Sequence, residues 1–470
     1  MLKKIKKVVE KNPNKNAYIY DSESITYEQL WNKAHNLADL LKRQGSSPVI
    51  IYGYKEIYVV ISIIACLIAK RTYVPIGTCM PLYRIKKIVD SVQSTLIITE
   101  SNFNIDGIDC LSIKELEKYK ENEIISNDND IAYIIYTSGS TGDAKGVPIT
   151  YDNLNNFIDW ISNLKPLKDY KDIKVLNQAS FSFDLSVADF YYSICNGHTL
   201  YAIDMNIQKD MEIVFDTIKE VNLIVVTPTF IKMCLLNHEF NELNYPNLKC
   251  IYSCGEKLEV NTVKKITERF SKIKIINAYG PTEATSAVCA ITITKEMIEK
   301  YDTLPVGDIN NLATDVSIVN DEIVLKGKSV FGGYLSNIKG GYYKENNINC
   351  YKTGDIGYIE DNMLFCKGRL DNQIKYMGYR IELNDIENNI NKIEGVKECI
   401  TLASYNDEGI VKTIKAYVIC DDNLTPNIIK KELSNKIPNY MIPKTIKILK
   451  SFPINENGKV DRKELSKLWK

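Results

Sequence analysis

The sequence lacks any apolar stretch long enough to cross a bilayer. Its longest apolar run, residues 57–69, is shorter than the roughly 20 residues that a membrane-spanning helix needs. The first residues, 1–14, are rich in lysine but contain no apolar segment of the kind that a secretory signal requires. We therefore expect no membrane insertion and a cytoplasmic location.

An excess of charge of one sign is also missing. Lys plus Arg and Asp plus Glu each number 59, so the formal net charge is zero. A strong positive field is what draws a protein to nucleic acids and anionic membranes, and the chain as a whole has none. We expect no nucleic-acid partner, and a charged ligand must be bound by a local set of side chains.

Paired cysteines are absent as well. The twelve cysteines are scattered through apolar stretches such as those around Cys66 and Cys366, without a CxxC pair and without a Cys/His cluster at zinc-binding spacing. This pattern argues against a zinc site and against a disulfide-stapled scaffold. It predicts buried free thiols in a reducing compartment.

The length and the residue patterns predict two domains. The chain has 470 residues, of which 45% are apolar, and this is too long for one hydrophobic core. Helical periodicity, as over residues 27–43, alternates with buried-strand patterns such as residues 223–226, which favours a large layered α/β domain. After about Gly368 two helical patterns, 383–392 and 426–436, alternate with two strands, which predicts a small α+β domain.

A segment rich in glycine and hydroxyl residues, YTSGSTGDAKG at 136–146, directly follows an apolar run at 131–135. Glycines let backbone N–H groups converge on phosphate oxygens, the hydroxyls add donors, and Lys145 adds a positive charge. The segment therefore predicts a phosphate-binding loop. It lacks the GxxxxGK[ST] order of a P-loop ATPase, and the alternative for such a segment taken alone is a flexible surface turn.

Four further motifs follow in order. They are NAYGPTE at 277–283, YKTGD at 351–355, GRLDNQIK at 368–375 continuing into GYRIEL at 378–383, and NGKVDR at 457–462. With the loop at 136–146, they resemble the core motifs of the adenylate-forming superfamily: adenylation domains of peptide synthetases, acyl-CoA synthetases and luciferases. The resemblance covers almost the whole chain. It implies a ligase with an AMP-binding domain over residues 1–369 and a mobile domain over residues 370–470.

The resemblance implies a site that uses ATP and Mg²⁺ to transfer AMP to a carboxylic acid. A carboxylate must attack the α-phosphorus, so the anionic repulsion has to be offset by cations and hydrogen-bond donors. Thr282 matches the residue that contacts the α-phosphate, and Glu283 matches the Mg²⁺ ligand. The residues that the resemblance assigns to the nucleotide are Thr137, Ser138, Gly139, Ser140, Thr141, Gly142, Lys145, Asn277, Ala278, Tyr279, Gly280, Asp355, Arg369 and Lys459.

Three of these residues are assigned to the nucleoside. Asp355 matches the carboxylate that accepts hydrogen bonds from both ribose hydroxyls, Arg369 matches a residue near the same sugar, and Tyr279 is expected to stack on adenine. The alternatives for the isolated residues are a turn aspartate after glycine and a solvated arginine.

Two residues near the C-terminus match moving parts of the superfamily. Lys459 matches the catalytic lysine that reaches from the small domain to bridge the substrate carboxylate and the α-phosphate. Asp371 matches the hinge at which that domain turns to a thioester-forming pose, which brings the strand around Lys375 and Gly378 to the acceptor tunnel. The alternatives are a surface lysine and ordinary turn formers.

The acid that is activated has to be inferred from the pocket. Asp184, in FSFDLSVA at 181–188, lies where amino-acid-activating members keep an aspartate that pairs with the substrate ammonium. A buried ammonium needs such a counter-charge. The alternative is a helix N-cap aspartate. The other residues that the resemblance assigns to the pocket wall are Leu185, Ala188, Val225, Tyr252, Cys254, Ala278, Ser286 and Ala287.

Several pocket segments resemble the D-alanine–carrier protein ligase family in particular, among them SCGE at 253–256 and LPVG at 304–307. Cys254 matches the cysteine that crowds the substrate α-carbon in that family and favours the D configuration; taken alone it would be a small core residue. Ala188 stands where the family usually carries methionine, so the pocket floor could admit a larger side chain. The expected substrate is a small amino acid, with D-alanine first.

The acceptor also follows from the resemblance. The sequence ends shortly after the small domain without a fused carrier, so we expect the phosphopantetheine thiol of a separate carrier protein to accept the acyl group as a thioester. Three alternatives stay open. They are a stand-alone enzyme that activates another small amino acid for nonribosomal peptide synthesis, an acyl- or aryl-CoA ligase, and a nucleotide-binding module without catalysis.

Overall fold

The computed structural model describes residues 1–114, 129–139, 142–335, 340–406, 409–454 and 460–468. These residues form two compact units. The first contains Met1–Thr78, Val89–Ile135 and Gly146–Leu370, and the second contains Cys79–Ile88, Tyr136–Lys145 and Asp371–Lys470. The sequence predicts a single boundary after residue 369, whereas in the structure the second unit also includes two short segments from the N-terminal part of the chain.

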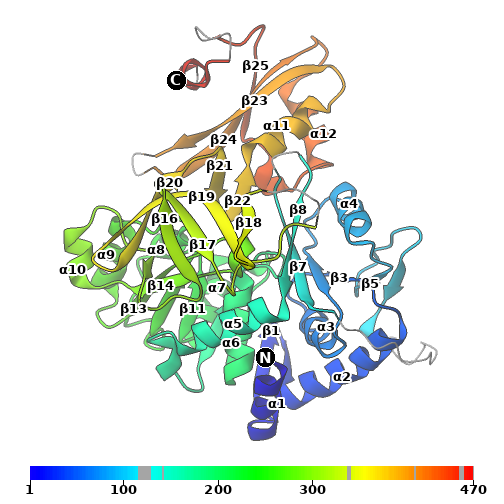
Figure 1. The fold of residues 1–470 in the computed structure, drawn as a ribbon, viewed down its shortest axis with the longest axis vertical. Helices are drawn as coiled ribbons and strands as arrows, with labels where there is room; N and C mark the ends of the chain where they lie inside the picture. Colours follow the sequence, from blue (N-terminus) through cyan, green and yellow to red (C-terminus); the bar gives the residue numbers. More distant parts are fainter. Residues whose placement is uncertain (115–128, 140–141, 336–339, 407–408, 455–459, 469–470) are drawn as a thin grey trace. The chain divides into compact units, whose positions relative to one another are not determined.

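An eight-stranded, mostly parallel sheet forms the centre of the first unit (Figure 1). In spatial order its strands are β14 (Cys289–Thr292), β13 (Lys274–Tyr279), β12 (Cys250–Ser253), β11 (Leu223–Val226), β9 (Lys174–Asn177), β10 (Thr199–Ala202), β1 (Asn16–Tyr20) and β2 (Glu23–Thr26). The two edge strands, β14 and β2, run antiparallel to their neighbours. The expected α/β class with a smaller second domain is confirmed.

Strand β11 explains why this sheet is buried on both faces. All four of its residues are apolar and buried, as expected for a parallel strand that helices cover on both sides. Val225 packs in the same core as α6 (Leu185–Asn196), and its neighbour Ile224 packs in a second core. That second core contains residues of α7 (Met211–Glu220), α8 (Pro228–Leu235) and α9 (Val260–Arg269).

A second, six-stranded sheet has the order β6 (Asp109–Leu111), β5 (Leu96–Ile98), β3 (Val49–Tyr52), β4 (Tyr73–Ile76), β7 (Ile131–Thr137) and β8 (Lys145–Thr150). Helix α3 (Ile57–Ile68) contains the longest apolar run, and its residues from Val59 to Leu67 are buried in the core of the first unit. None of the helices in the described ranges is both long and apolar enough to cross a membrane.

A third sheet in the first unit is antiparallel. Its order is β15 (Gly307–Asp308), β20 (Met363–Arg369), β19 (Ile348–Glu360), β17 (Glu322–Lys326) and β16 (Asp315–Val319), and β18 (Tyr342–Glu345) pairs with β19. The register of β19 and β20 sets Asp355 opposite Arg369. This pairing places two of the predicted nucleotide-binding residues side by side.

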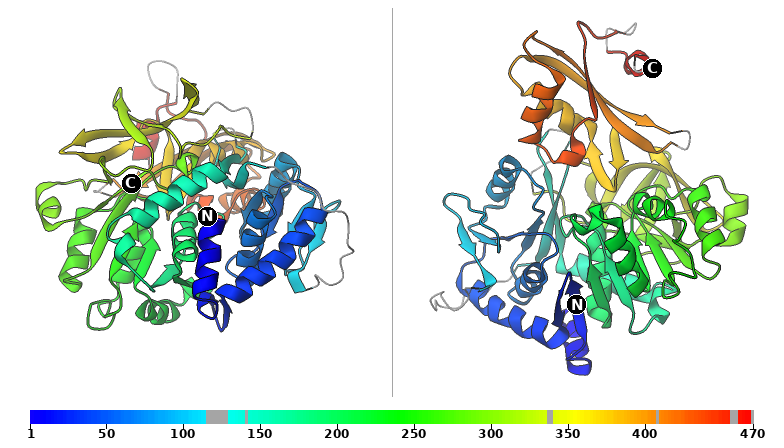
Figure 2. Two further views of the ribbon diagram at one scale, coloured as in Figure 1. Left: turned by 60° about the horizontal axis from the view of Figure 1, so that its bottom comes forward. Right: turned by 180° about the vertical axis from the view of Figure 1, so that it is seen from behind.

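The remaining helices of the first unit lie around the sheets. Helix α1 (Leu2–Lys11) packs against α6 and α2 (Tyr27–Arg43), and α5 (Tyr151–Asn163) also packs against α6 (Figure 2). A short helix, α10 (Lys295–Lys300), contacts α9. Helix α4 (Leu82–Val92) begins in a segment of the second unit. Short 3-10 helices, among them η4 (Thr282–Ala284), connect some of these elements.

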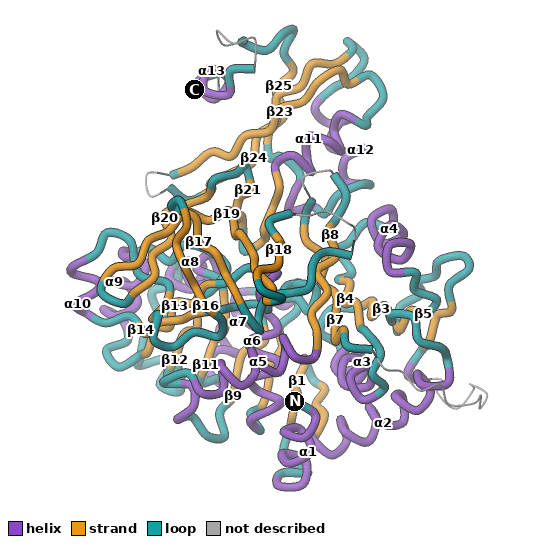
Figure 3. The backbone as a smooth tube through the Cα atoms, in the orientation of Figure 1, coloured by secondary structure: helices purple, strands orange, loops and turns teal. Residues whose placement is uncertain are grey.

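The second unit has its own apolar core. It contains the hairpin β21 (Gln373–Tyr376) and β22 (Tyr379–Glu382), and a sheet of β23 (Val396–Tyr405), β24 (Val411–Cys420) and β25 (Thr445–Ile448) (Figure 3). Helices α11 (Leu383–Asn391) and α12 (Pro426–Ser434) supply Ile386 and Ile429 to this core. They are the two helices that the sequence predicts, and α13 (Arg462–Lys467) follows near the end of the chain.

Candidate functional site

The residues predicted to line the amino-acid pocket lie at the side of the eight-stranded sheet where its parallel strands end. Strands β9, β11, β12 and β13 are parallel neighbours, and the register aligns Asn177, Val225, Tyr252 and Ile276. These residues lie at or near the carboxyl ends of their strands, which is where open α/β sheets bind ligands. Cys254 directly follows β12, and Ala278 is the second-to-last residue of β13.

Asp184 lies directly before α6, next to the carboxyl ends of these strands. It occupies the N-cap position, but its side chain makes no cap hydrogen bond. Its Oδ2 instead accepts a hydrogen bond of 2.6 Å from the Thr282 hydroxyl, although the two residues are 98 positions apart in the sequence. Both are buried, with 8% and 6% of their surfaces exposed. The Asp184 carboxylate therefore does not cap the helix in this structure.

The other predicted pocket residues are buried in the first unit: Leu185, Ala188, Val225, Tyr252, Cys254, Ala278, Ser286 and Ala287. Within the described part of the chain, the Tyr252 hydroxyl is buried without a hydrogen-bond partner. Burial raises the pKa of Tyr252 well above its ordinary value, so this hydroxyl is a neutral donor. No signal in the sequence distinguishes this tyrosine from one that packs only through its ring.

The loop after β13 is held in an uncommon backbone shape. Thr285 and Ser286 have φ angles of 62° and 68°, and residues other than glycine adopt such values rarely and at a cost of order 1–3 kcal/mol, mostly at functional sites. At Gly280, an added Cβ would lie 2.5 Å from the Cα of Ala287. Only glycine allows the two chain segments to approach this closely.

Glu283, the predicted metal ligand, lies in η4 with 1% of its surface exposed. The Tyr334 hydroxyl donates a hydrogen bond of 2.6 Å to its Oε1, and the Tyr334 and Tyr351 hydroxyls are 3.3 Å apart. No group of three His, Cys, Asp or Glu side chains suited to a metal occurs among the described residues. Mg²⁺ usually binds one or two protein carboxylates together with phosphate oxygens and water, so the single carboxylate of Glu283 fits such an ion.

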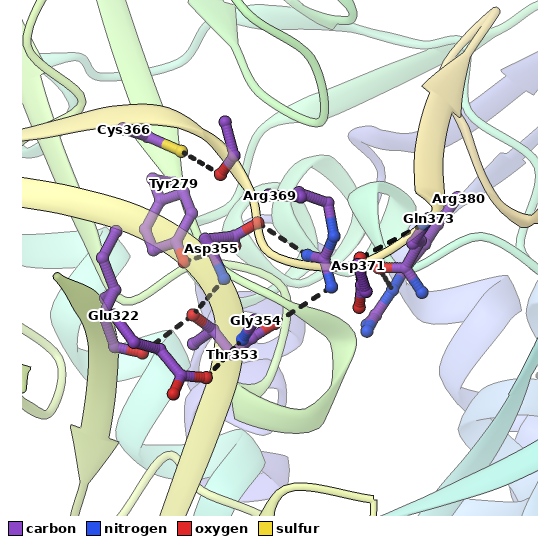
Figure 4. A network of polar contacts seen from close by, with 12 residues as sticks. Tyr279, Glu322, Thr353, Gly354, Asp355, Cys366, Arg369, Asp371, Gln373 and Arg380 are labelled. Carbon is purple, nitrogen blue, oxygen red and sulfur yellow. Dashed lines mark hydrogen bonds and ion pairs between the residues drawn. The ribbon is translucent and has the colours of Figure 1, made fainter. Parts of the chain in front are cut away.

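Asp355 is the centre of the predicted nucleoside site (Figure 4). The Tyr279 hydroxyl donates to its Oδ2 at 2.6 Å, and Nη1 of Arg369 lies 2.6 Å from its Oδ1. A carboxylate has about four acceptor positions, and these two contacts from described residues leave room for the two hydroxyls of a ribose. Burial raises the pKa of Tyr279 well above its ordinary value, which keeps the phenol protonated and able to donate.

The predicted phosphate loop belongs to the second unit, and part of it is engaged there. The Ser138 hydroxyl donates to the carbonyl of Arg380 at 2.9 Å and accepts from the N–H of Glu382 at 3.0 Å. Asn389 donates to the carbonyl of Gly142 at 3.3 Å. An added Cβ on Gly139 would collide with the carbonyl of Asp143, so the turn requires glycine there.

Some of the other residues predicted to bind the nucleotide lie in the described part of the chain, and some do not. Lys145 is buried at the start of β8, and Thr137 is half-buried at the end of β7. The side-chain amide of Asn277 donates to the carbonyl of Pro305 at 2.8 Å, so it serves the fold. Ser140, Thr141 and Lys459 lie outside the described residues.

Asp371, the predicted hinge, is the first residue of the C-terminal segment of the second unit. Its Oδ1 accepts from the N–H of Gln373 at 3.1 Å. Gln373 begins β21, and its side chain contacts β22, because it accepts from Arg380 at 2.6 Å and donates to Glu382 at 2.7 Å. The structure thus gives Asp371 a turn-forming contact, and its role as a hinge stays a prediction.

A buried polar cluster beneath the pocket segment was not predicted. The Lys55 ammonium donates to the side-chain oxygen of Asn177 at 2.6 Å and to the carbonyl of Ala179, and lies 4.5 Å from the ring centre of Phe181. Asn177 donates at 2.9 Å to Asp189 of α6. Burial lowers the pKa of Lys55 and raises that of Asp189, each to about 7.

Comparisons with known proteins assign most of the chain to a family. A family described as AMP-binding enzyme matches residues 5–335, and its C-terminal domain family matches residues 385–459. The D-alanine–D-alanyl carrier protein ligase of Bacillus licheniformis is 36% identical over 99% of this chain and 98% of its own. The protein of the same name from Staphylococcus epidermidis is also 36% identical, over 98% and 97% of the two chains.

A solved structure extends the comparison to the fold. The Vibrio cholerae adenylation domain AlmE, in complex with glycyl-adenosine-5'-phosphate, superposes with a TM-score of 0.87 at 22% identity, covering 99% of this chain and 97% of that chain. The superfamily resemblance that the motifs predict is confirmed.

Proposed function

The chain belongs to the family of AMP-binding enzymes, and we propose that it activates D-alanine with ATP and then passes it to a carrier protein. It is a ligase that forms an aminoacyl-adenylate first and a thioester second. Support comes from ligases of that name that match over nearly their full length at 35–36% identity. A carrier protein as partner follows from the same similarity.

One observation carries the proposal for this chain's own residues. The buried Asp184 carboxylate is hydrogen-bonded to Thr282 at 2.6 Å. Asp184 supplies the counter-charge that a buried ammonium needs, and Thr282 supplies a hydroxyl donor for the α-phosphate. An α-amino acid carries its ammonium and its carboxylate on one carbon atom, so the two recognition groups have to be neighbours, as they are here.

In the first half-reaction, a carboxylate oxygen of the amino acid attacks the α-phosphorus of ATP. A new oxygen–phosphorus bond forms, the bond to the β-phosphate oxygen breaks, and pyrophosphate leaves with the electron pair. Thr282, Lys145 and Lys459 are proposed to stabilise the charge on the phosphoryl oxygens and to offset the repulsion between the two anions. Asp355, held by Tyr279 and Arg369, is proposed to fix the ribose.

Mg²⁺ is proposed as the metal of this site, with Glu283 as its protein ligand. When bound, the ion neutralises part of the phosphate charge. The Tyr334 hydroxyl fixes the orientation of the Glu283 carboxylate through Oε1. The remaining loop residues Thr137, Ser138, Gly139, Ser140, Thr141 and Gly142 are proposed to contact the β- and γ-phosphates.

In the second half-reaction, the phosphopantetheine thiol of a separate carrier protein attacks the carbonyl carbon of the adenylate. A thioester bond forms, AMP leaves with the electron pair, and the thiol proton passes to solvent. Residues 370–470 are proposed to turn about Asp371 between the two half-reactions, so that Lys459 serves only the first. The proposed compartment is the cytoplasm.

Amino-acid-dependent exchange of labelled pyrophosphate into ATP tests the reaction and the substrate together. We expect exchange with D-alanine that exceeds exchange with L-alanine, and none with propionate, which lacks the ammonium. Asp184→Asn removes the counter-charge at nearly constant volume and should raise the KM for D-alanine steeply without an equal effect on the KM for ATP.

The same assay separates the alternative functions. Exchange that depends on a fatty or aromatic acid and ignores every amino acid would identify an acyl- or aryl-CoA ligase. Exchange that depends on a different small amino acid would keep the reaction and replace the substrate. No exchange with any acid would reject the adenylating activity.

A further inference from the structure

The hydrogen bond between Thr282 and Asp184 joins the two proposed ligand sites of the first unit. Thr282 begins η4, and Asp184 lies directly before α6. The donor oxygen and the acceptor oxygen are 2.6 Å apart, a distance typical of a short, charge-assisted bond. With both residues at least nine-tenths buried, neither group can exchange this contact freely for water.

A threonine hydroxyl has a single proton to donate. In this structure it is directed to a carboxylate, so it is not available to a phosphoryl oxygen at the same time. A buried carboxylate that loses a hydrogen-bond donor is destabilised, because water cannot freely replace the donor. A new donor that reaches Asp184 would therefore release the Thr282 hydroxyl for another acceptor.

We propose that Thr282 couples the two substrates: its hydroxyl is held by Asp184, and a substrate ammonium that binds Asp184 in its place releases it for the α-phosphate. This inference rests on the proposed function. An ammonium brings three donors and a full positive charge, so it replaces one hydroxyl at Asp184 with a net gain. The exchange needs no backbone movement, because a hydroxyl proton rotates about its C–O bond.

The consequence is positive cooperativity between the amino acid and the nucleotide. Each ligand binds more tightly when the other is present, by the same factor in both directions. The enzyme thereby places its α-phosphate donor in position only when there is a carboxylate to adenylate, and this limits the attack of water on ATP.

A purely structural role for the same hydrogen bond leads to a different expectation. If it only braces η4 against α6, loss of the hydroxyl lowers the free energy of unfolding and affects nucleotide binding equally with and without the amino acid. The proposed role predicts an effect on nucleotide binding that appears only when the amino acid is bound.

Titration calorimetry with an ATP analogue whose α,β-bridging oxygen is replaced by methylene tests the proposal, because this analogue cannot be cleaved at the α-phosphorus. The dissociation constant is measured with and without saturating D-alanine. We expect the wild-type enzyme to bind the analogue at least about fivefold more tightly with D-alanine, in the usual range of coupling factors. In Thr282→Val the ratio of the two dissociation constants should fall toward one.

Three controls accompany this measurement. Thr282→Ser keeps the hydroxyl and should keep the wild-type ratio. Lys145→Met should weaken the analogue by the same factor in both conditions, because Lys145 is proposed to contact phosphates regardless of the amino acid. Propionate in place of D-alanine should give no enhancement. Should Thr282→Val fold poorly in a thermal melt, Thr282→Ala also removes the hydroxyl and should likewise bring the ratio toward one.

The outcomes separate this inference from the proposed function. If Thr282→Val keeps the wild-type ratio of dissociation constants, with or without a general loss of affinity, the coupling role is wrong. The proposed function then still stands as long as D-alanine supports pyrophosphate exchange. If no amino acid supports exchange, the proposed function itself is wrong.

Discussion

The Tyr334 hydroxyl donates a hydrogen bond of 2.6 Å to Oε1 of Glu283, across 51 positions of the sequence. Tyr334 is itself held in place, since its ring packs edge-to-face on Phe331 and its hydroxyl lies 3.3 Å from that of Tyr351. The backbone N–H of Phe331 also donates to the carbonyl of Glu283 at 2.8 Å. The orientation of the proposed metal ligand is thus set by residues outside the sequence motif.

Tyr334→Phe should weaken the response to Mg²⁺. The variant keeps the ring packing and removes the hydrogen bond that orients Glu283, and loss of such supporting contacts commonly costs about 10–100-fold in metal affinity or activity. We expect the Mg²⁺ concentration that gives half-maximal pyrophosphate exchange to rise at least about tenfold. Tyr342→Phe, which removes a hydroxyl bonded to Asn349, is the matched control. If the Mg²⁺ dependence of Tyr334→Phe is unchanged, Glu283 is not a metal ligand that Tyr334 orients.

Tyr279→Phe should raise the KM for ATP and leave the KM for D-alanine nearly unchanged. The variant keeps the ring and deletes the 2.6 Å hydrogen bond to Asp355. Hydrogen bonds to charged groups contribute about 1.5–3 kcal/mol, so we expect an increase in KM of about tenfold or more. Tyr301→Phe removes a phenol bonded to the exposed Asp361 and should have no such effect. Equal changes in both KM values would contradict the assignment of Asp355 to the ribose.

The motifs predict which residues belong to the site, but not which of them touch each other. Asp355 and Tyr279 come from separate motifs, and spacing alone gives no reason for the phenol to bond to the carboxylate. The pairing follows from tertiary structure, because the antiparallel register of β19 and β20 sets Asp355 opposite Arg369. The helix-cap alternative for Asp184 could likewise be rejected only when Thr282 was seen to be its donor.

The buried cluster around Lys55 could not be predicted from the sequence, and the reason is physical. Lysine usually lies at the surface, and the segment Tyr54-Lys55-Glu56 resembles an ordinary turn between a strand and a helix. In the structure Lys55 is fully buried, and its ammonium is bonded to Asn177 and Ala179. Its partners lie more than 120 positions away, so only the packing of β9 and α6 reveals them.

Stability should fall as the pH is lowered from about 6.5 to about 4, in part because of His198. Burial lowers the pKa of His198 to about 4, and its side chain is almost fully buried. In this range the unfolded chain binds a proton at His198 and the folded protein does not, so the free energy of unfolding decreases as the pH falls. At about 1.4 kcal/mol for each pKa unit, this side chain accounts for up to about 3 kcal/mol.

His198→Asn isolates this contribution. Asn cannot take up a proton, and its side-chain oxygen can replace Nδ1 of His198 as acceptor for the N–H of Ile173, which lies 3.4 Å away. Denaturant unfolding at pH 7 and at pH 4.5 measures the slope with pH in both proteins. We expect a shallower slope in the variant, and equal slopes would mean that another group controls the acid sensitivity.

Cys254 is expected to determine which enantiomer of the substrate is preferred. Cys254 follows β12 directly, is 4% exposed, and donates its backbone N–H to the carbonyl of Val226 at 3.3 Å, which fixes the position of its Cβ. If the thiol lies beside the substrate α-carbon, the side chain of an L-amino acid meets the sulfur, and that of the D-isomer turns toward Ala188. D-alanine should then exchange faster than L-alanine. In Cys254→Ala the ratio of D-alanine exchange to L-alanine exchange should fall by about tenfold or more, which corresponds to the roughly 1–3 kcal/mol expected for one steric contact in a pocket.

Two further variants test this geometry. Cys234→Ala removes a thiol that is buried in the other core of the first unit and should leave the D-to-L ratio unchanged. Ala188→Met should exclude D-serine and D-2-aminobutyrate more strongly than D-alanine, because the added side chain fills the floor that those substrates need. If the wild-type enzyme strongly prefers any L-amino acid, the assignment of D-alanine as substrate is wrong. The assignment of the reaction, amino-acid activation by AMP transfer, would not be affected.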